Sequence, residues 1–333
     1  MTASAAAGAS VRSRGLTAER AVARRLVHKL ALEQVFATGA VRIGEDEWAA
    51  LVQLPRANRL FNDTLQPYPD LLLLCEAARQ GVMVVLHECL DVPLDLHFVT
   101  TRLDVRLDDL DANLPGPLPT EMTIAVSFDS ERRHRDGSLR AVQGEARCHV
   151  GEARAGTFAG ALRFLPRTTY TAARDGAPSS SALKAERPAR AEPRAVGRSD
   201  PRNVVVAPPE PDGGGYVVLA SPDPADPVFF DHPQDHYPGM LLLEVARQAA
   251  IASAAAATGE RPERFVPLRA TARFGRFAEL GEPLRCHAEV TERGPARIAL
   301  ALRLEQRGER LAPVAVELAV VGDGATADHE DAP

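Results

Sequence analysis

The sequence predicts an α+β fold built from two copies of one module, in which an antiparallel sheet encloses an apolar helix. Three observations predict it. An apolar helical segment recurs in the two halves of the 333-residue chain, alternating segments follow each helix, and a polar, Pro-rich stretch separates the halves. The chain is longer than one typical core requires and suits two domains of ordinary size.

The two helical segments carry the same polar signature. The first reads LLLLCEAARQGVMVVLHECL over 71–90, and the second reads MLLLEVARQAAIASAAAA over 240–257. Aligning Glu76 with Glu244 also aligns the Arg-Gln pairs that follow them, which indicates an internal duplication. Each segment is apolar almost all round, which predicts a helix of about 15–18 residues enclosed by other elements rather than lying on a surface.

Alternating apolar and polar residues predict strands around each helix. The expected strands are 47–55, 96–107, 122–130, 144–150 and 156–166 in the first copy, and 215–222, 269–277, 284–293, 296–308 and 313–321 in the second. One strand, one buried helix and then several long strands is the layout of the hotdog fold. Two such modules in one chain predict a tandem, or double, hotdog that forms a pseudo-dimer.

Composition divides the chain into five parts. We expect a flexible N-terminal arm (1–25), a first hotdog module (26–169), a Pro/Ala/Arg-rich linker (170–202), a second hotdog module (203–321) and a disordered tail (322–333). The linker combines Pro, Ala, Ser and charged residues with almost no large apolar side chain, so it lacks the surface that a segment must bury in order to fold.

Charge and composition exclude several classes of function. A net charge of −6 and a pI near 5.9 disfavour nucleic acid as the main partner. The sequence has no apolar run of 18 residues and no secretory signal, so we expect no membrane contact and a cytoplasmic location. We also expect no metal and no cofactor, because the four cysteines form no CxxC pair and read as buried thiols: Cys75, Cys89, Cys148 and Cys286.

Around these helices the chain resembles a known family. The second copy reads DHYPGMLLLEVARQA from Asp235 to Ala249, which is similar to the signature of the A-factor biosynthesis (AfsA) family of γ-butyrolactone synthesis proteins. The first copy matches more loosely and in order at Val27-His28, Pro55-Arg56, Asp70, Glu76, Arg79-Gln80 and His97-Phe98. It departs from the family pattern where Asn58 replaces a histidine and Pro69-Asp70-Leu71 replaces His-Asp-Pro, and the second copy has Asp226 where a histidine is common.

The resemblance implies an acyltransferase. In this family a β-ketoacyl group passes from an acyl carrier protein thioester to the primary hydroxyl of dihydroxyacetone phosphate, and the ester closes to a butenolide phosphate on the way to a γ-butyrolactone signal. The implied partners are therefore the β-ketoacyl carrier protein and dihydroxyacetone phosphate. The chain is expected to act as a monomeric pseudo-dimer or as a homodimer.

Acyl transfer to an alcohol requires a base, an oxyanion donor and groups that hold both substrates. We predict Glu244, His236 and Asp235 as catalytic: burial suits Glu244 to acid–base work, and Asp235 orients His236. The predicted substrate-binding residues are Gly239 and Met240, whose N–H groups face out of the helix N-terminus, together with Arg247, Gln248, Glu76, Arg79, Gln80, Asp70 and Arg273. The chemistry is expected to centre on the second copy, while the first supplies scaffold and one wall.

Structural roles compete with these assignments. Glu244–Arg247 and Glu76–Arg79 have the i,i+3 spacing of helix ion pairs, and Asp70 and Asp235-His236 have the position of helix caps. Two other functions also fit the fold: a dehydratase or thioesterase acting on acyl thioesters, and a non-catalytic ligand-binding or regulatory protein. The sequence leaves open the acyl chain length, the signal molecule and the number of working sites.

Overall fold

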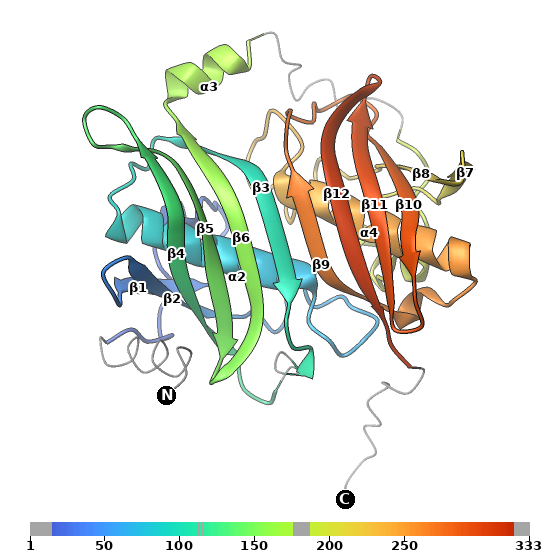
Figure 1. Ribbon diagram of the computed structural model, residues 1–333, viewed down its shortest axis with the longest axis horizontal. Helices are drawn as coiled ribbons and strands as arrows, with labels where there is room; N and C mark the ends of the chain where they lie inside the picture. Colours follow the sequence, from blue (N-terminus) through green and yellow to red (C-terminus); the bar gives the residue numbers. More distant parts are fainter. Residues whose placement is uncertain (1–14, 112–113, 115, 176–186, 323–333) are drawn as a thin grey trace, which may run out of the picture.

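The strands of the chain form one continuous sheet that curves around two helices (Figure 1). The computed structural model describes residues 15–111, 114, 116–175 and 187–322. Within these residues the sheet has 12 strands, and every neighbouring pair is antiparallel. The predicted α+β layout is confirmed.

Each copy contributes six strands. The first contributes β1 (Ala37–Arg42), β2 (Glu47–Gln53), β3 (His97–Leu107), β4 (Glu121–Arg133), β5 (Leu139–Val150) and β6 (Ala153–Leu165). The second contributes β7 (Glu210–Asp212), β8 (Gly215–Leu219), β9 (Phe265–Arg273), β10 (Arg285–Arg293), β11 (Arg297–Gln306) and β12 (Glu309–Val320). The sequence pattern did not indicate β1 or β7, which are short edge strands.

The strand order shows the duplication directly. It runs β1-β2-β4-β5-β6-β3 and then β9-β12-β11-β10-β8-β7, so each strand of the first module has a counterpart at the mirrored place in the second. The modules join where β3 pairs with β9, with Leu103 opposite Ala272. The predicted tandem hotdog is therefore confirmed, and the two modules share one sheet.

Two apolar helices fill the concave side of the sheet. They are α2 (Leu71–Val84), which continues as the π-helical turn η3 (Val85–Cys89), and α4 (Gly239–Thr258). By length and composition alone α4 is apolar enough to cross a membrane, but 78% of its most apolar window is buried inside the fold. The enclosing sheet, as the sequence predicted, accounts for that apolarity.

The predicted linker (170–202) is wrong at both ends: residues 170–173 form the end of the helix α3 (Arg167–Ala173), and residues 187–202 belong to the second module. This segment contains the 3₁₀ turns η6 (Pro193–Val196) and η7 (Pro201–Asn203), and the side chain of Arg198 is fully buried. The polar composition misled the prediction because the charge of Arg198 is matched by buried carboxylates far away in the sequence. Residues 176–186 lie outside the described part of the chain.

Further short helices join the strands. The first module begins with η1 (Arg24–Val27) and η2 (Leu32–Gln34), η8 (Pro262–Arg264) precedes β9, and α3 (Arg167–Ala173) follows β6. The predicted flexible arm is shorter than expected, because the Val22 N–H donates to the Ala37 carbonyl and the turn η1 begins at Arg24. Residues 1–14 of that arm, and 323–333 of the predicted tail, lie outside the described residues.

Candidate active site

A cavity of about 1030 Å³ lies where the two modules meet. The first module contributes residues of η1, one face of α2, and β3 and β6 to its wall. The second contributes the entry of α4 and the turn after β9, residues 274–278. The N-terminal end of α4 therefore faces a space that both modules enclose.

His236 stands at the entry of α4 and lines this cavity. Its Nδ1 lies 2.6 Å from a carboxylate oxygen of Asp235. That hydrogen bond holds the pKa of Asp235 well below its ordinary value, and further bonds from Arg174 and Tyr170 act in the same direction. An ionised carboxylate only accepts, so Nδ1 carries the proton and Nε2 is the basic nitrogen of neutral His236.

Helix α3 reaches from the first module across to this pair. The Tyr170 hydroxyl donates to Asp235 at 2.9 Å, and the Arg174 guanidinium donates to Asp235 at 2.9 Å and to Glu279 at 2.6 Å. The ring of His97 stacks on Tyr170 with centroids 4.0 Å apart. Asp235 is thus fixed by groups from outside its own module.

The start of α4 presents backbone donors. The first N–H to make an intrahelical bond is that of Leu242, which donates to the Pro238 carbonyl, so the N–H groups of Gly239 and Met240 have no partner within the helix. Both residues line the cavity. The helix dipole adds partial positive charge at this end, which suits an anionic group there.

Another part of the cavity wall carries the signature of the first copy. The carboxylate of Glu76 accepts two hydrogen bonds from Arg79, at 2.7 and 2.8 Å, and lies 3.3 Å from the ammonium of Lys29. Burial alone would raise the pKa of Glu76, but the charges of Arg79 and Lys29 outweigh it and lower that pKa to about 2. Glu76 is therefore ionised at neutral pH, and all three residues line the cavity.

Gln80 attaches this group to the rest of the module. Its side-chain carbonyl accepts from the Phe36 N–H at 2.7 Å, and its amide donates to the Gln34 carbonyl and to Glu76. Gln80 is fully buried and does not line the cavity. Its role in this structure is to orient Glu76.

One contact brings the two parts of the wall together. The Cys75 thiol, next to Glu76 on α2, lies 3.8 Å from the Met240 sulfur at the start of α4. The carboxylate wall of the first copy and the helix entry of the second are thus adjacent parts of one site.

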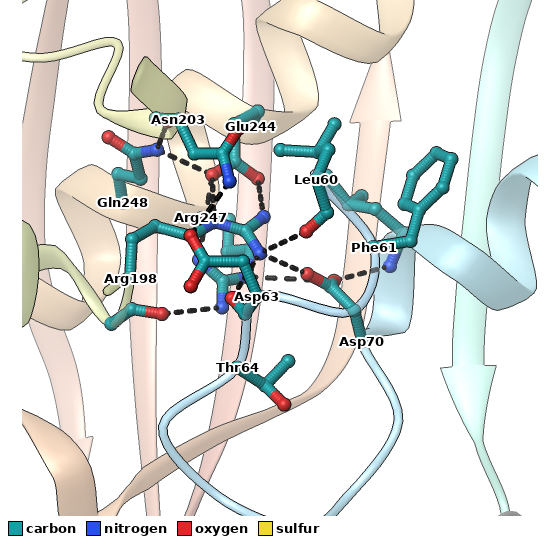
Figure 2. Close-up of polar contacts among 12 residues, drawn as sticks. Leu60, Phe61, Asp63, Thr64, Asp70, Arg198, Asn203, Glu244, Arg247 and Gln248 are labelled. Atoms are coloured by element: carbon teal, nitrogen blue, oxygen red, sulfur yellow. Dashed lines mark hydrogen bonds and ion pairs between the residues drawn. The ribbon is translucent and has the colours of Figure 1, made fainter. Parts of the chain in front are cut away.

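In the second copy the same signature lies in a closed ion network (Figure 2). The guanidinium of Arg198 donates to both oxygens of Glu244, at 2.9 and 2.7 Å, and lies 2.7 Å from Asp70. It also donates to the carbonyls of Leu60 and Asp63, each at 2.8 Å. Burial opposes the charge on Arg198, yet Glu244 and Asp70 raise its pKa above the ordinary value. The donors of Arg198 are thus taken up by protein groups.

Arg247 completes this network. It lies 3.6 Å from Glu244 and 3.6 Å from Asp70, and it donates to the Gly197 carbonyl at 3.3 Å. Burial lowers the pKa of Arg247, and the neighbouring charge of Arg198 lowers it further. Two guanidinium groups and two carboxylates therefore balance one another inside the fold.

Gln248 in the second copy repeats the role of Gln80. Its carbonyl accepts from the Val205 N–H at 2.9 Å, and its amide donates to the Asn203 carbonyl and to Glu244. The Glu-x-x-Arg-Gln signature is therefore, in both copies, a device that ties the core helix to the 3₁₀ turns before the sheet.

The two copies differ at one position. The turn η1 ends at His28, whose backbone is left-handed, and the next residue is Lys29. The turn η6 ends in the same way at Gly197, and the next residue is Arg198. Lys29 contacts Glu76 only at 3.3 Å and is partly exposed, whereas Arg198 forms a paired contact to Glu244 and reaches Asp70 as well. Arginine can do this because its planar fork carries five donors. It closes the second copy's site, while the first stays open.

The predicted site residues therefore fall into two groups. Those that line the cavity are His236, Gly239, Met240, Glu76 and Arg79, with Asp235 directly behind His236. Those that do not line it are Glu244, Arg247, Gln248, Gln80, Asp70 and Arg273. Asp70 caps α2 by accepting from the Leu72 N–H and joins the Arg198 network, and Arg273 is exposed on β9. The sequence predicted Glu244 as a catalytic carboxylate, but Glu244 does not line the cavity, whereas Glu76 of the first copy does.

Sequence reasoning missed Lys29, Tyr170, Arg174 and Arg198. Lys29 directly follows the matched Val27-His28 pair, which was a usable signal, but the other three lie in segments of linker-like composition. The cysteines are unsuited to nucleophilic roles, because burial raises the pKa of Cys148 and of Cys286 to about 12. Within the described residues no cluster of three or more His, Cys, Asp or Glu side chains has the arrangement of a metal site.

Comparison with known proteins places the chain in a family. The family model described as the A-factor biosynthesis hotdog domain matches residues 12–165 and 179–322. The 2-oxo-3-(phosphooxy)propyl 3-oxoalkanoate synthase of Streptomyces griseus is 33% identical over 259 residues, which are 78% of this chain and 82% of that protein. The protein of the same name from Streptomyces coelicolor is 32% identical over 277 residues, 81% of this chain and 82% of that protein.

Among solved structures, a 12:0-ACP thioesterase from Umbellularia californica aligns with a TM-score of 0.47 and 9% identity, over 84% of this chain and 100% of that chain. The family assignment rests on the sequence matches. One model fits both halves of the chain, and its two segments coincide with the two modules that share the sheet. The chain belongs to the A-factor biosynthesis hotdog family.

Proposed function

We propose that this protein transfers a β-ketoacyl group from an acyl carrier protein thioester to the primary hydroxyl of dihydroxyacetone phosphate, in the cytoplasm, as a step toward a γ-butyrolactone-type signal. The name of its relatives describes the ester that such a transfer makes. One observation carries the proposal: His236 at a helix entry and the Lys29–Glu76–Arg79 group line the same cavity. One chain, with one open site, is the proposed working unit.

The cavity suits an acyl chain. Its volume of about 1030 Å³ is in the range of small-molecule sites. Apolar side chains form much of its wall, among them Val82, Met83, Val126, Phe128, Phe158 and Leu162. These residues come from the first module, so we place the alkyl part of the donor against α2 and the inner face of the sheet.

The wall near η1 suits the phosphate of the acceptor. Four cations lie there, Arg24, Arg25, Lys29 and Arg79, against the two carboxylates Glu76 and Asp231. Asp231 is itself engaged, because it accepts from the backbone N–H groups of Leu30 and Ala31. The remaining positive charge favours a phosphate dianion. Glu76, ionised and bonded to Arg79, holds these cations in place instead of moving a proton.

His236 is the proposed base. Its Nε2 takes the proton of the primary hydroxyl, and Asp235 stabilises the imidazolium that results. The hydroxyl oxygen attacks the thioester carbonyl carbon, and the N–H groups of Gly239 and Met240 stabilise the oxyanion. The carbon–sulfur bond then breaks, the proton passes from His236 to the leaving thiolate, and the new ester is released.

Reconstitution tests the proposal. The purified chain is incubated with a 3-oxooctanoyl carrier protein and dihydroxyacetone phosphate, and the products are analysed by mass spectrometry. We expect a phosphorylated β-ketoacyl ester or its butenolide, formed at least about a hundredfold more slowly by His236→Ala. Loss of thioester at the same rate without dihydroxyacetone phosphate would instead identify a thioesterase.

A matched pair of carboxylate variants separates the two copies. Glu76→Gln removes the charge that holds Lys29 and Arg79 in the cavity wall, so we expect the folded variant to have a higher KM for dihydroxyacetone phosphate. Glu244→Gln disturbs the buried network and should lower the unfolding midpoint, while the KM of the folded enzyme stays near the original. The reverse pattern would return the active site to the second copy.

A further inference from the structure

The opening of the cavity is rich in arginine. The exposed charged residues that line it comprise five arginines and one carboxylate: Arg24, Arg25, Arg102, Arg163 and Arg276, against Asp95. A side chain that both lines the cavity and is exposed stands at its mouth. This concentration of positive charge occurs on a chain whose net charge is −6.

Two of these positions meet at the junction of the modules. Arg102 on β3 lies directly opposite Arg273 on β9 in the antiparallel register. Both are exposed, and neither has an ion-pair partner among the residues that the structure describes. Like charges directly opposite each other in a sheet are destabilising. Folding by itself therefore gains nothing from this pair.

Their neighbours extend the same surface. Arg163 on β6 is exposed, and its β6 neighbour Ala161 lies opposite Arg102. Arg276 follows β9 and forms an ion pair with Glu309, in which both side chains are more than half exposed to solvent. Such an exposed ion pair contributes little stability, so Arg276 can give up Glu309 for a carboxylate of another protein. We call Arg102, Arg163, Arg273 and Arg276 the arginine rim.

We propose that the arginine rim is the docking surface for the acidic acyl carrier protein that delivers the β-ketoacyl group. This proposal rests on the function proposed above and names the surface that its donor uses. The thioester must enter the cavity while the carrier remains outside, so the carrier has to bind at the mouth. Complementary charge at a rim accelerates encounter and fixes orientation more than it adds contact energy.

The surface fits a small acidic protein better than a nucleic acid. Only four arginines form it, and the chain as a whole is acidic, so a long polyanion would meet repulsion beyond the rim. A compact carrier touches the rim alone. Arg273, which the sequence indicated as a candidate contact but which does not line the cavity, takes its role here as a contact to the carrier.

Binding is measured separately from catalysis. Fluorescence anisotropy of a labelled holo acyl carrier protein of bacterial fatty-acid synthesis reports its affinity for the intact chain. We expect R102E/R273E to weaken binding at least about tenfold, and the original protein to bind less tightly as salt rises. The matched control is Arg297→Glu, because Arg297 is an exposed arginine that lies away from the rim. Arg297 on β11 pairs with Ala319 on β12, and Ala319 pairs with Val266, near the end of β9 that is remote from Arg273.

Kinetics with two donors completes the test. R102E/R273E should raise the KM for the carrier-borne donor about tenfold and leave turnover of the same acyl group on N-acetylcysteamine unchanged. Equal losses with both donors, an unchanged affinity, or an equal effect of Arg297→Glu overturns the docking surface. If the carrier binds at the rim but no ester forms with either donor, the proposed function fails while the docking surface stands.

Discussion

Replacing Arg198 with alanine tests whether the second copy's signature is a structural network. The guanidinium lies 2.7 Å from Asp70 and 2.7 Å from Glu244, and all three side chains are fully buried. Among the described residues, Arg247 is then the one cation left beside the two carboxylates, at 3.6 Å from each. Removing one member of a buried ion network costs about 3–5 kcal/mol, because an uncompensated charge stays inside. In a chain of 333 residues a loss of that size lowers the melting temperature by roughly 4–7 °C.

The pH dependence of the loss identifies its cause. Burial alone would raise the pKa of Asp70, and the charges of Arg198 and Arg247 lower it below the ordinary value. A lowered folded-state pKa contributes stability that is present above the unfolded value of about 3.9 and is lost as the pH falls through the folded value. Without Arg198 burial dominates, so the deficit of the variant should be largest near neutral pH and smaller near pH 5.

Denaturant unfolding near pH 7 and near pH 5 measures the free energy of unfolding that Arg198→Ala loses, with Lys29→Ala as the matched control. Lys29 occupies the equivalent place in the first copy, but Glu76 keeps its two bonds from Arg79, and Lys29 is partly exposed. We therefore expect Lys29→Ala to cost at most about 1 kcal/mol. If Arg198→Ala costs no more than the control, or if its deficit grows toward pH 5, then the assignment of a stabilising role to this network is refuted.

Three further predictions concern the open site. His236→Ala should lower kcat by about 10²–10⁴ without moving the unfolding midpoint, and a kcat within threefold of the original would remove His236 as the base. Lys29→Met should raise the KM for dihydroxyacetone phosphate about tenfold but leave that of dihydroxyacetone unchanged, which a competition assay decides. Tyr170→Phe should lower kcat up to about tenfold and weaken the Nδ1–H signal of His236 in nitrogen NMR; an unchanged signal contradicts a positioning role for Tyr170.

Local sequence patterns were sufficient for the fold. The run around Leu71–Leu74 has no polar face, so its helix had to be enclosed, and α2 is buried along its whole length. The long alternating segments appear as strands within a few residues of their predicted ends, as at β3 (His97–Leu107). Both signals depend on neighbours along the chain, which is why they can be read without tertiary information.

The site was only partly predictable for the opposite reason. The helix entry with Asp235 and His236 is a local motif, and the structure places His236 in the cavity. The difference between Glu76 and Glu244 is not local: the residue that closes the second site, Arg198, is 46 positions from Glu244 and lies in a Pro- and Arg-rich segment.

By itself the sequence determined the duplication, the two enclosed helices, the strand layout and the helix entry that carries His236, because each of these repeats a short-range pattern. Only the tertiary structure decided which copy keeps an open site. That choice depends on which distant cation reaches each buried carboxylate: Lys29 leaves Glu76 at the cavity wall, and Arg198 seals Glu244 and Asp70 inside. The joining of α3 to Asp235 is a contact of the same long-range kind.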